Sequence, residues 1–263
     1  MTKQIRIERG DVAFDAYLAL PEAGSGPVVV LLQEIFGVNA EMREVADLYA
    51  AEGYVVIAPD LFHPFGPNIE LGYGEADHAK AFDYYGRLDV AGAIEDIRAT
   101  VARARTLPES NGKVGVLGFC LGGKLAWLAA AQCGVDCAVG YYGVGIEQSL
   151  DLAERVTCPL ALHFGVDDPL NPPGTVAAIR AALGGKPNVK LYEYEAPVMR
   201  SAAAARPSSK RPRCPRIRAV LRCFARCSVP TTTWARSPII TSIWSSPRAI
   251  PTRRCGRWCP SRT

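Results

Sequence analysis

The sequence predicts an α/β domain built on a mostly parallel sheet with helices on both faces. Two observations predict it. Short apolar runs such as 27–32 (PVVVLL) have the length and the β-branched content of strands buried on both faces. These runs alternate along the chain with longer segments of helical periodicity, an order that favours parallel strands joined by crossover helices.

The individual elements follow from local signals. Residues 5–8 and 12–20 are expected strands, and Arg9-Gly10-Asp11 between them is a hairpin signal. Asn39 can cap a helix that ends near Gly53. A helix is expected from 77 to about 105, with a break near Gly86. The remaining expected strands are 27–32, 54–58, 113–117, 135–141, 159–164 and 189–194, and the remaining helices are 121–131 and 176–183.

The balance of acidic and basic residues changes at residue 196. The 263 residues carry a net charge of +4, but residues 1–196 contain 26 acidic and 15 basic side chains. Residues 197–263 contain 15 basic side chains, no acidic ones and five of the nine cysteines. A single folded domain seldom has such a split. We therefore expect one domain at 1–196 and an irregular, disordered Arg/Pro/Ser-rich tail at 197–263.

Two further classes are disfavoured by the sequence. No stretch of about 18 apolar residues occurs, so a membrane span is not expected. Residues 1–6 lack the apolar core of a secretory signal. We expect a cytoplasmic, monomeric protein that acts on a small molecule.

The strongest chemical signal is GFCLGG at 118–123, which lies between an expected strand and an expected helix. This is the context of a nucleophile elbow, in which Gly118 and Gly122 supply the small residues that the sharp turn needs. The helix N-terminus favours a thiolate at Cys120, and the backbone N–H of Leu121 is placed to stabilise an oxyanion. The alternative is a buried cysteine beside glycines that pack a helix.

Two other loops follow buried strands, so they should lie at the same edge of the sheet as Cys120. Glu34, in QEIFG (33–37), can receive the thiol proton, and the N–H of Ile35 is a second candidate oxyanion donor. Asp168 can orient a catalytic histidine, although the pair Asp167-Asp168 also suits a turn. His163 lies within a strand and is expected to be a packing residue.

These motifs together resemble the dienelactone hydrolase (carboxymethylenebutenolidase) family of the α/β-hydrolase fold. The matching stretches are QEIFGVN (33–39), APDLF (58–62), SNGKVGVLGFCLGG (110–123), AVGYYGVGIE (138–147) and HFGVDDP (163–169).

The resemblance implies a Cys–His–Asp triad that opens an enol-lactone to maleylacetate in aromatic and chloroaromatic degradation, without a metal or cofactor. It assigns the nucleophile to Cys120, the triad acid to Asp168 and the thiol's proton acceptor to Glu34, with Ile35 and Leu121 at the oxyanion hole. His78 falls where the family has an arginine for the substrate carboxylate. Tyr141 and Tyr142 are candidates either for the substrate pocket or for packing.

The chain departs from the family at the triad histidine. The last expected strand is followed by Glu195-Ala196-Pro197-Val198-Met199, where the family has Glu-Ala-Gly-His-x-Phe, and no histidine comes later. Without that group, activity of this chain is expected to be impaired.

A shifted reading frame explains both the missing histidine and the tail. The residues from Pro197 to Ser201 can be encoded so that a shift of two bases reads Gly-His-Ala-Phe. A tail rich in Arg, Pro, Ser, Cys and Trp but without acids is typical of G+C-rich DNA read out of frame. We therefore hypothesise a frameshift at Ala196/Pro197, which resequencing codons 190–205 tests.

Other interpretations of the chain remain open. The tail's cations could bind nucleic acid, but no binding module is recognisable and frequent prolines oppose regular structure. Cys223-x3-Cys227 and Cys255-x3-Cys259 are only weakly zinc-like. The protein is thus a dienelactone-type hydrolase, a broader ester or lactone hydrolase, or a non-catalytic protein with a basic tail.

Overall fold

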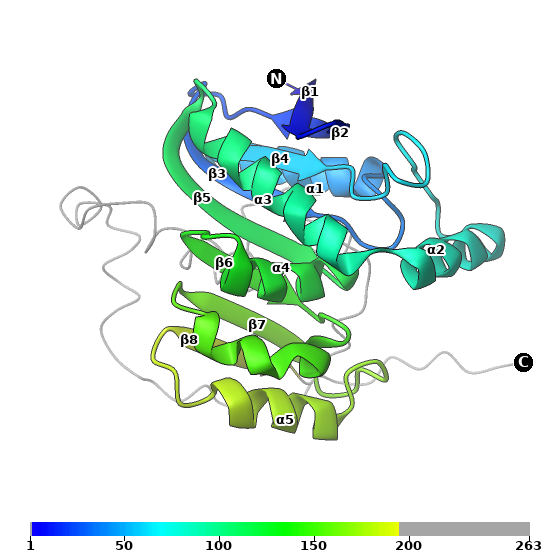
Figure 1. The fold of residues 1–263 in the computed structure, drawn as a ribbon, viewed down its shortest axis with the longest axis vertical. Helices are drawn as coiled ribbons and strands as arrows, with labels where there is room; N and C mark the ends of the chain where they lie inside the picture. The colour runs from blue at the N-terminus through cyan, green and yellow to red at the C-terminus, as the bar shows by residue number, and fades with distance from the viewer. Residues whose placement is uncertain (1, 195–263) are drawn as a thin grey trace, which may run out of the picture. The chain divides into compact units, whose positions relative to one another are not determined.

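The computed structural model describes residues 2–194, which form an α/β domain around a single sheet (Figure 1). Its eight strands are β1 (Thr2–Arg9), β2 (Val12–Ala19), β3 (Gly26–Leu32), β4 (Val55–Pro59), β5 (Ser110–Phe119), β6 (Cys137–Tyr141), β7 (Leu160–Gly165) and β8 (Val189–Tyr194). The helices are α1 (Ala40–Ala51), α2 (Glu75–Arg87), α3 (Val90–Thr106), α4 (Leu121–Gln132) and α5 (Pro173–Leu183), with the 3₁₀ segment η1 (Ile146–Arg155).

The sheet has the order β1-β2-β4-β3-β5-β6-β7-β8. The hairpin of β1 and β2 is antiparallel, and β2 pairs antiparallel with β4. All pairs from β4 through β8 are parallel, so the carboxyl ends of β3, β5, β6 and β7 open onto one edge. The loops that follow these strands carry the chemically interesting motifs.

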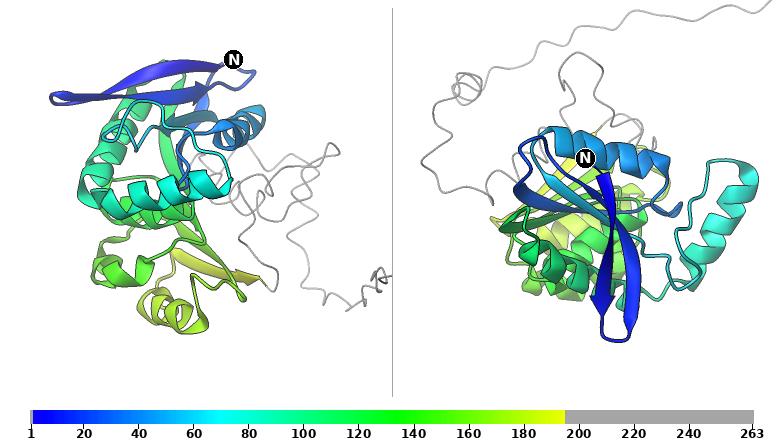
Figure 2. Two further views of the ribbon diagram at one scale, coloured as in Figure 1. Left: turned by 90° about the vertical axis from the view of Figure 1, so that its right-hand side faces the viewer. Right: turned by 90° about the horizontal axis from the view of Figure 1, so that it is seen from above.

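Helices cover both faces of the sheet, as the sequence predicts. The views in Figures 1 and 2 place α3, α4 and α5 on one face and α1 on the opposite face. Alternate side chains of β3 accordingly belong to different core layers, with Val28 and Val30 in one and Val29 and Leu31 in the other. A strand buried on both faces explains the continuous apolar run in the sequence.

The expected long helix is two helices, and the break falls at Leu88–Asp89, near Gly86 as predicted. Gly86 lies inside α2, which ends at Arg87. Asp89 caps α3 by accepting a hydrogen bond from the Ala91 N–H at 3.0 Å. A capping side chain satisfies an otherwise unpaired N–H, so it marks a boundary more strongly than a glycine does. The segment η1 was not predicted.

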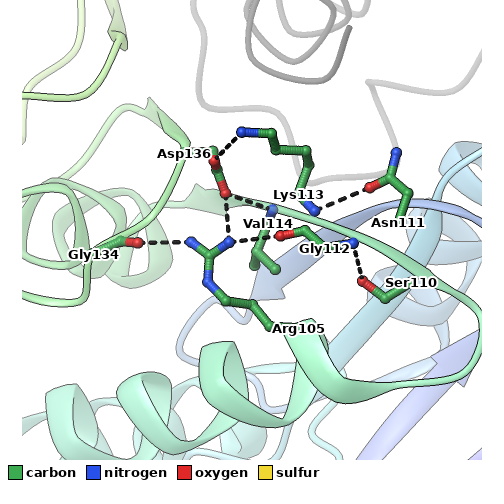
Figure 3. Close-up of polar contacts among 8 residues, drawn as sticks. All are labelled: Arg105, Ser110, Asn111, Gly112, Lys113, Val114, Gly134 and Asp136. Atoms are coloured by element: carbon green, nitrogen blue, oxygen red, sulfur yellow. Dashed lines mark hydrogen bonds and ion pairs between the residues drawn. The ribbon is translucent and has the colours of Figure 1, made fainter.

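A hydrogen-bonded network stabilises the end of the sheet at which β5 begins, away from the carboxyl ends of the parallel strands (Figure 3). Arg105 donates from Nη1 to Asp136 Oδ2 at 2.8 Å and to the Gly112 carbonyl at 2.7 Å. Asp136 also accepts from Lys113 Nζ at 3.0 Å and from the Val114 N–H at 2.9 Å. The carboxylate therefore ties α3, β5 and the start of β6 together.

Within residues 2–194, no helix is both long enough and apolar enough to cross a membrane. The expected tail, the proposed frameshift and the five tail cysteines lie outside the described residues.

Candidate active site

Cys120 lies at the turn between β5 and α4, where its backbone has φ 54° and ψ −115°. A positive φ is unfavourable for a residue with a side chain, so the surrounding structure must impose it. The Cys120 N–H donates to the Tyr141 carbonyl at 3.0 Å, and its own carbonyl accepts from the Lys124 N–H at 3.2 Å. These bonds hold the turn between β6 and the first turn of α4.

The glycines on either side of Cys120 allow this turn to form. A Cβ at Gly118 would overlap the backbone of Gly122, and a Cβ at Gly122 would overlap the backbone of Leu32 and Gln33. A Cβ at Gly123 would overlap the Tyr141 carbonyl. The G-x-C-x-G-G pattern therefore lets α4 begin directly against β3 and β6.

The Cys120 thiol is protonated at neutral pH in this environment. Burial raises its pKa to about 12; the negative charge of Glu34 and, less strongly, that of Asp168 add to the rise, while the Leu121 N–H opposes it. The thiolate expected from the helix N-terminus is therefore not the resting form, because desolvation and two carboxylates outweigh one backbone donor. The sulfur needs a proton acceptor before it can attack.

Glu34 is buried, with 6% exposure, in the loop after β3. Its Oε1 accepts a hydrogen bond from the Tyr142 hydroxyl at 3.1 Å. Tyr142 itself has φ 38°, and its N–H donates to the His163 carbonyl at 2.7 Å. Tyr142 thus leaves the end of β6 in a constrained conformation that brings its hydroxyl to Glu34.

The loop that carries Glu34 and Ile35 is anchored at both ends. The Gln33 side chain accepts from the Leu61 N–H at 2.9 Å, and the Phe36 carbonyl accepts from the Leu71 N–H at 2.9 Å. Ile35 lies between them and is buried. Asn39 caps α1 as predicted, accepting from the Met42 N–H at 3.1 Å.

Asp168 is 4% exposed in the loop after β7, and its charge acts on Cys120. Its Oδ1 accepts from the Leu170 N–H and its Oδ2 from the Asn171 side chain, both at 2.9 Å. Asn171 is fully buried and was not predicted as a site residue. It fixes the carboxylate that the sequence singled out.

The three histidines have partners away from this cluster. His63 Nε2 lies 2.9 Å from Asp96 Oδ2, and its ring stacks on Phe14. His78, on α2, packs edge-on against Phe36.

His163 is fully buried in β7, as expected of a packing residue. Its ring stacks between Tyr141 and Tyr192, and its Nδ1 lies 2.8 Å from the Tyr194 hydroxyl. Tyr141 also stacks on Phe119, so the four rings form an aromatic ladder across β5, β6, β7 and β8.

Two residues near Cys120 were missed by the sequence reasoning. The pKa of Tyr85 on α2 is raised by burial and by the charges of Cys120 and Glu147. Glu147 lies in the first turn of η1, and its Oε2 is buried without a hydrogen-bond partner among the described residues. No motif marks Tyr85, whereas Glu147 ends the matching stretch 138–147 without having been given a role. Residues 2–194 contain no group of three His, Cys, Asp or Glu side chains that could hold a metal ion.

A strained cysteine between a parallel strand and a helix, with acids on neighbouring strand-end loops, defines an α/β-hydrolase. The model of the dienelactone hydrolase family matches residues 14–198. The chain belongs to this family and is a hydrolase of the dienelactone hydrolase type.

Named relatives and a solved structure agree with this assignment. The chain is 40% identical over 198 residues to a carboxymethylenebutenolidase from a Pseudomonas species, covering 74% of this chain and 83% of the relative. It is 36% identical over 182 residues to carboxymethylenebutenolidase 1 of Cupriavidus pinatubonensis, covering 69% and 78%. A Klebsiella pneumoniae structure assigned as a dienelactone hydrolase is similar with a TM-score of 0.73 at 25% identity, covering 86% and 98%.

Proposed function

We propose that this protein hydrolyses enol-lactones of the dienelactone class, and related carboxylic esters, by acyl transfer to Cys120. The observation that carries the proposal is the strained turn that presents the Cys120 sulfur beside Glu34 and Asp168. The names of the relatives, carboxymethylenebutenolidases, support dienelactone as the substrate, and the family resemblance implies maleylacetate as the product. We place the reaction in the degradation of aromatic compounds.

The first half of the reaction uses groups that this chain has. Glu34 takes the thiol proton as the sulfur attacks the lactone carbonyl carbon. The N–H groups of Leu121 and Ile35 stabilise the resulting oxyanion. Collapse of the tetrahedral intermediate breaks the ring C–O bond, the enol oxygen takes up a proton, and the acyl group remains on sulfur as a thioester.

The second half of the reaction, hydrolysis of the thioester, lacks a histidine base. Water must attack the thioester carbonyl and give up a proton, which in the family is the task of a histidine held by the triad acid. In this chain Asp168 is held in place by Asn171, but none of the three histidines joins it. We therefore expect the acyl-enzyme to accumulate and its hydrolysis to limit turnover.

Free imidazole offers a direct test, because it can replace the missing base. With 4-nitrophenyl acetate, the chain should release about one equivalent of nitrophenol per Cys120 and then turn over slowly. Imidazole should accelerate the slow phase. The control is Cys120→Ala, which should show neither the initial release nor any acceleration beyond that of imidazole alone. Equal behaviour of the two proteins would refute the role of Cys120.

A broader ester hydrolase is the second candidate. It is favoured by His78 at the position where the resemblance expects an arginine, and by the rings of Phe36, Tyr73 and Phe82 near it. Turnover of a panel of lactones and aryl esters, compared with dienelactone, separates the two candidates.

A further inference from the structure

The loop after β7 carries Asp168 to the edge of the sheet at which Cys120 lies. Phe119, Tyr141 and His163 are paired neighbours across β5, β6 and β7. Cys120 directly follows the first of them, and Asp168 comes five residues after the last. Neighbouring strands are about 4.8 Å apart, so the two loops begin about 10 Å apart at one edge. The charge of Asp168 acts on the Cys120 thiol, in agreement with this placement.

Asn171 holds the Asp168 carboxylate in a fixed orientation. Its Nδ2 donates to Asp168 Oδ2 at 2.9 Å, and its backbone N–H donates to the Asp168 carbonyl at 3.1 Å. The Leu170 N–H donates to the other carboxylate oxygen, also at 2.9 Å. Donors on both oxygens fix the rotation of the carboxylate. Each oxygen can still accept a second hydrogen bond, so a further N–H donor can join.

The Asn171 side chain is buried in a way that packing alone does not explain. The residue is 1% exposed, and its Oδ1 is buried with no hydrogen-bond partner among residues 2–194. A buried amide oxygen without a partner is destabilising, and an apolar side chain of similar size would avoid this penalty. The amide is therefore better explained by its bond to Asp168 than by its fit in the core.

We infer that Asn171 is a positioning residue, whose amide holds Asp168 in the orientation that accepts an N–H of the base for thioester hydrolysis. The inference rests on the proposed role of Cys120 as nucleophile. A base of the imidazole class binds Asp168 through one nitrogen and takes a proton from water with the other. The water oxygen bonds to the acyl carbon, the C–S bond breaks, and the base returns the proton to the sulfur.

Two small bases distinguish this role from a general effect. Imidazole has an N–H as well as a basic nitrogen, whereas N-methylimidazole is a similar base without an N–H. Acetyl-Cys120 is formed in the full chain with 4-nitrophenyl acetate and separated from reagent by gel filtration. Mass mapping of the Cys120 peptide then follows loss of the acetyl group with each base.

The quantity measured is the ratio of the imidazole rate constant to the N-methylimidazole rate constant. The same ratio for the free thioester S-acetyl-N-acetylcysteine amide gives the intrinsic difference between the bases. We expect the ratio at Cys120 to be about tenfold higher than for the free thioester, because only imidazole can donate to a charged acceptor at Asp168.

Loss of the amide should remove this difference between the bases. Asn171→Leu and the smaller Asn171→Ala should each bring the ratio close to that of the free thioester, and Asp168→Asn should lower it as well. Asp167→Asn, the same change at the exposed neighbouring carboxylate, should leave the ratio unchanged. A purely structural role of Asn171 would slow both bases equally, so the ratio would not move.

Each contrary outcome has a distinct meaning. A wild-type ratio no higher than that of the free thioester would overturn the inference, and this measurement requires no variant to fold. A high ratio that persists in both Asn171 variants would overturn it too. An equal fall in Asp167→Asn and Asp168→Asn would assign the effect to net charge and contradict a positioned contact. Failure to form acetyl-Cys120 at all would instead refute the proposed function.

Discussion

At the scale of single residues, the turn at 118–123 holds a cysteine thiol in surroundings that disfavour the thiolate. Cys120 has a helix N-terminus behind it, yet burial and Glu34 keep its proton on. A thiol whose pKa is raised in this way stays largely protonated at neutral pH, and this protects it from alkylation and oxidation by chance reagents. Such a thiol needs a proton acceptor nearby. Glu34 is the candidate, and the Tyr142 hydroxyl holds its carboxylate by a hydrogen bond.

Gly122, whose Cβ would reach the backbone at the end of β3, should be hard to replace. In Gly122→Ala the new methyl group would lie 2.8 Å from the Gln33 carbonyl oxygen, so α4 or β3 must shift. We expect a loss of about 3 kcal/mol in the free energy of unfolding, measured by urea titration. Gly174→Ala is the control, because nothing lies within 4 Å of its new Cβ, and it should be neutral or slightly stabilising. Equal stabilities of the two variants would contradict this account.

The site residues that could be predicted are those marked by a local sequence pattern. Cys120, Glu34 and Asp168 each follow a buried strand, and strand ends of a parallel sheet meet at one edge. Tyr85 and Glu147 could not be found this way, since their position depends on how α2 and η1 pack against that edge. The protonation of Cys120 also depends on burial, which local sequence does not specify.

At the scale of elements, boundaries were predicted well where a cap or an apolar run defines them. Most strands and α1 follow such signals, and α4 ends within one residue of its prediction, whereas β1 and β5 each begin three residues earlier than predicted. The break between α2 and α3 was predicted near Gly86 and lies at Leu88–Asp89, where the Asp89 side chain caps α3. The 3₁₀ segment η1 was missed although Ile146, Leu150 and Ala153 recur at helical spacing, and Ile146 and Ala153 are buried.

The network at the start of β5 should give the domain a pH-dependent stability. Arg105, Lys113 and the Val114 N–H together hold the pKa of Asp136 below its usual value, against the opposing effect of burial. Asp136 therefore stabilises the fold above the pKa of the unfolded state, and this contribution is lost as pH falls through the folded pKa. Asp136→Asn should cost about 2 kcal/mol at pH 7 in urea unfolding.

The difference between wild type and Asp136→Asn should shrink as the pH falls below about 4. Asp151→Asn, at an exposed carboxylate, is the control and should change little at any pH. A constant difference between wild type and Asp136→Asn from pH 7 to pH 3 would argue against the ion network as its source.

At the scale of the whole molecule, an α/β-hydrolase sheet in residues 2–194 is followed by a sequence that contains no histidine. The family match ends at residue 198, close to the point where acidic residues cease. We propose that the encoded enzyme has its histidine in the other reading frame. The basic tail as a nucleic-acid-binding element is the competing proposal, and salt-dependent retention on nucleic acid tests it.

Restoring the frame after Ala196 should restore catalysis. A gene that encodes Gly-His-Ala-Phe after Ala196 should yield a protein whose turnover of dienelactone is at least about 10³-fold higher than that of the present chain. The same gene with Cys120→Ala provides the background rate. Equal turnover of the restored and present chains would mean that the lost histidine is not what limits hydrolysis.

The position of β8 has a consequence for how such a chain survives in a cell. Among residues 2–194, β8 is an edge strand that pairs with β7 alone, and it is the last of the described strands in the chain. All eight described strands are therefore translated before the ribosome reaches codon 196. The proposed slip of the reading frame there would remove catalytic groups while sparing these strands, so we expect its product to escape the quality control that clears chains with a broken sheet.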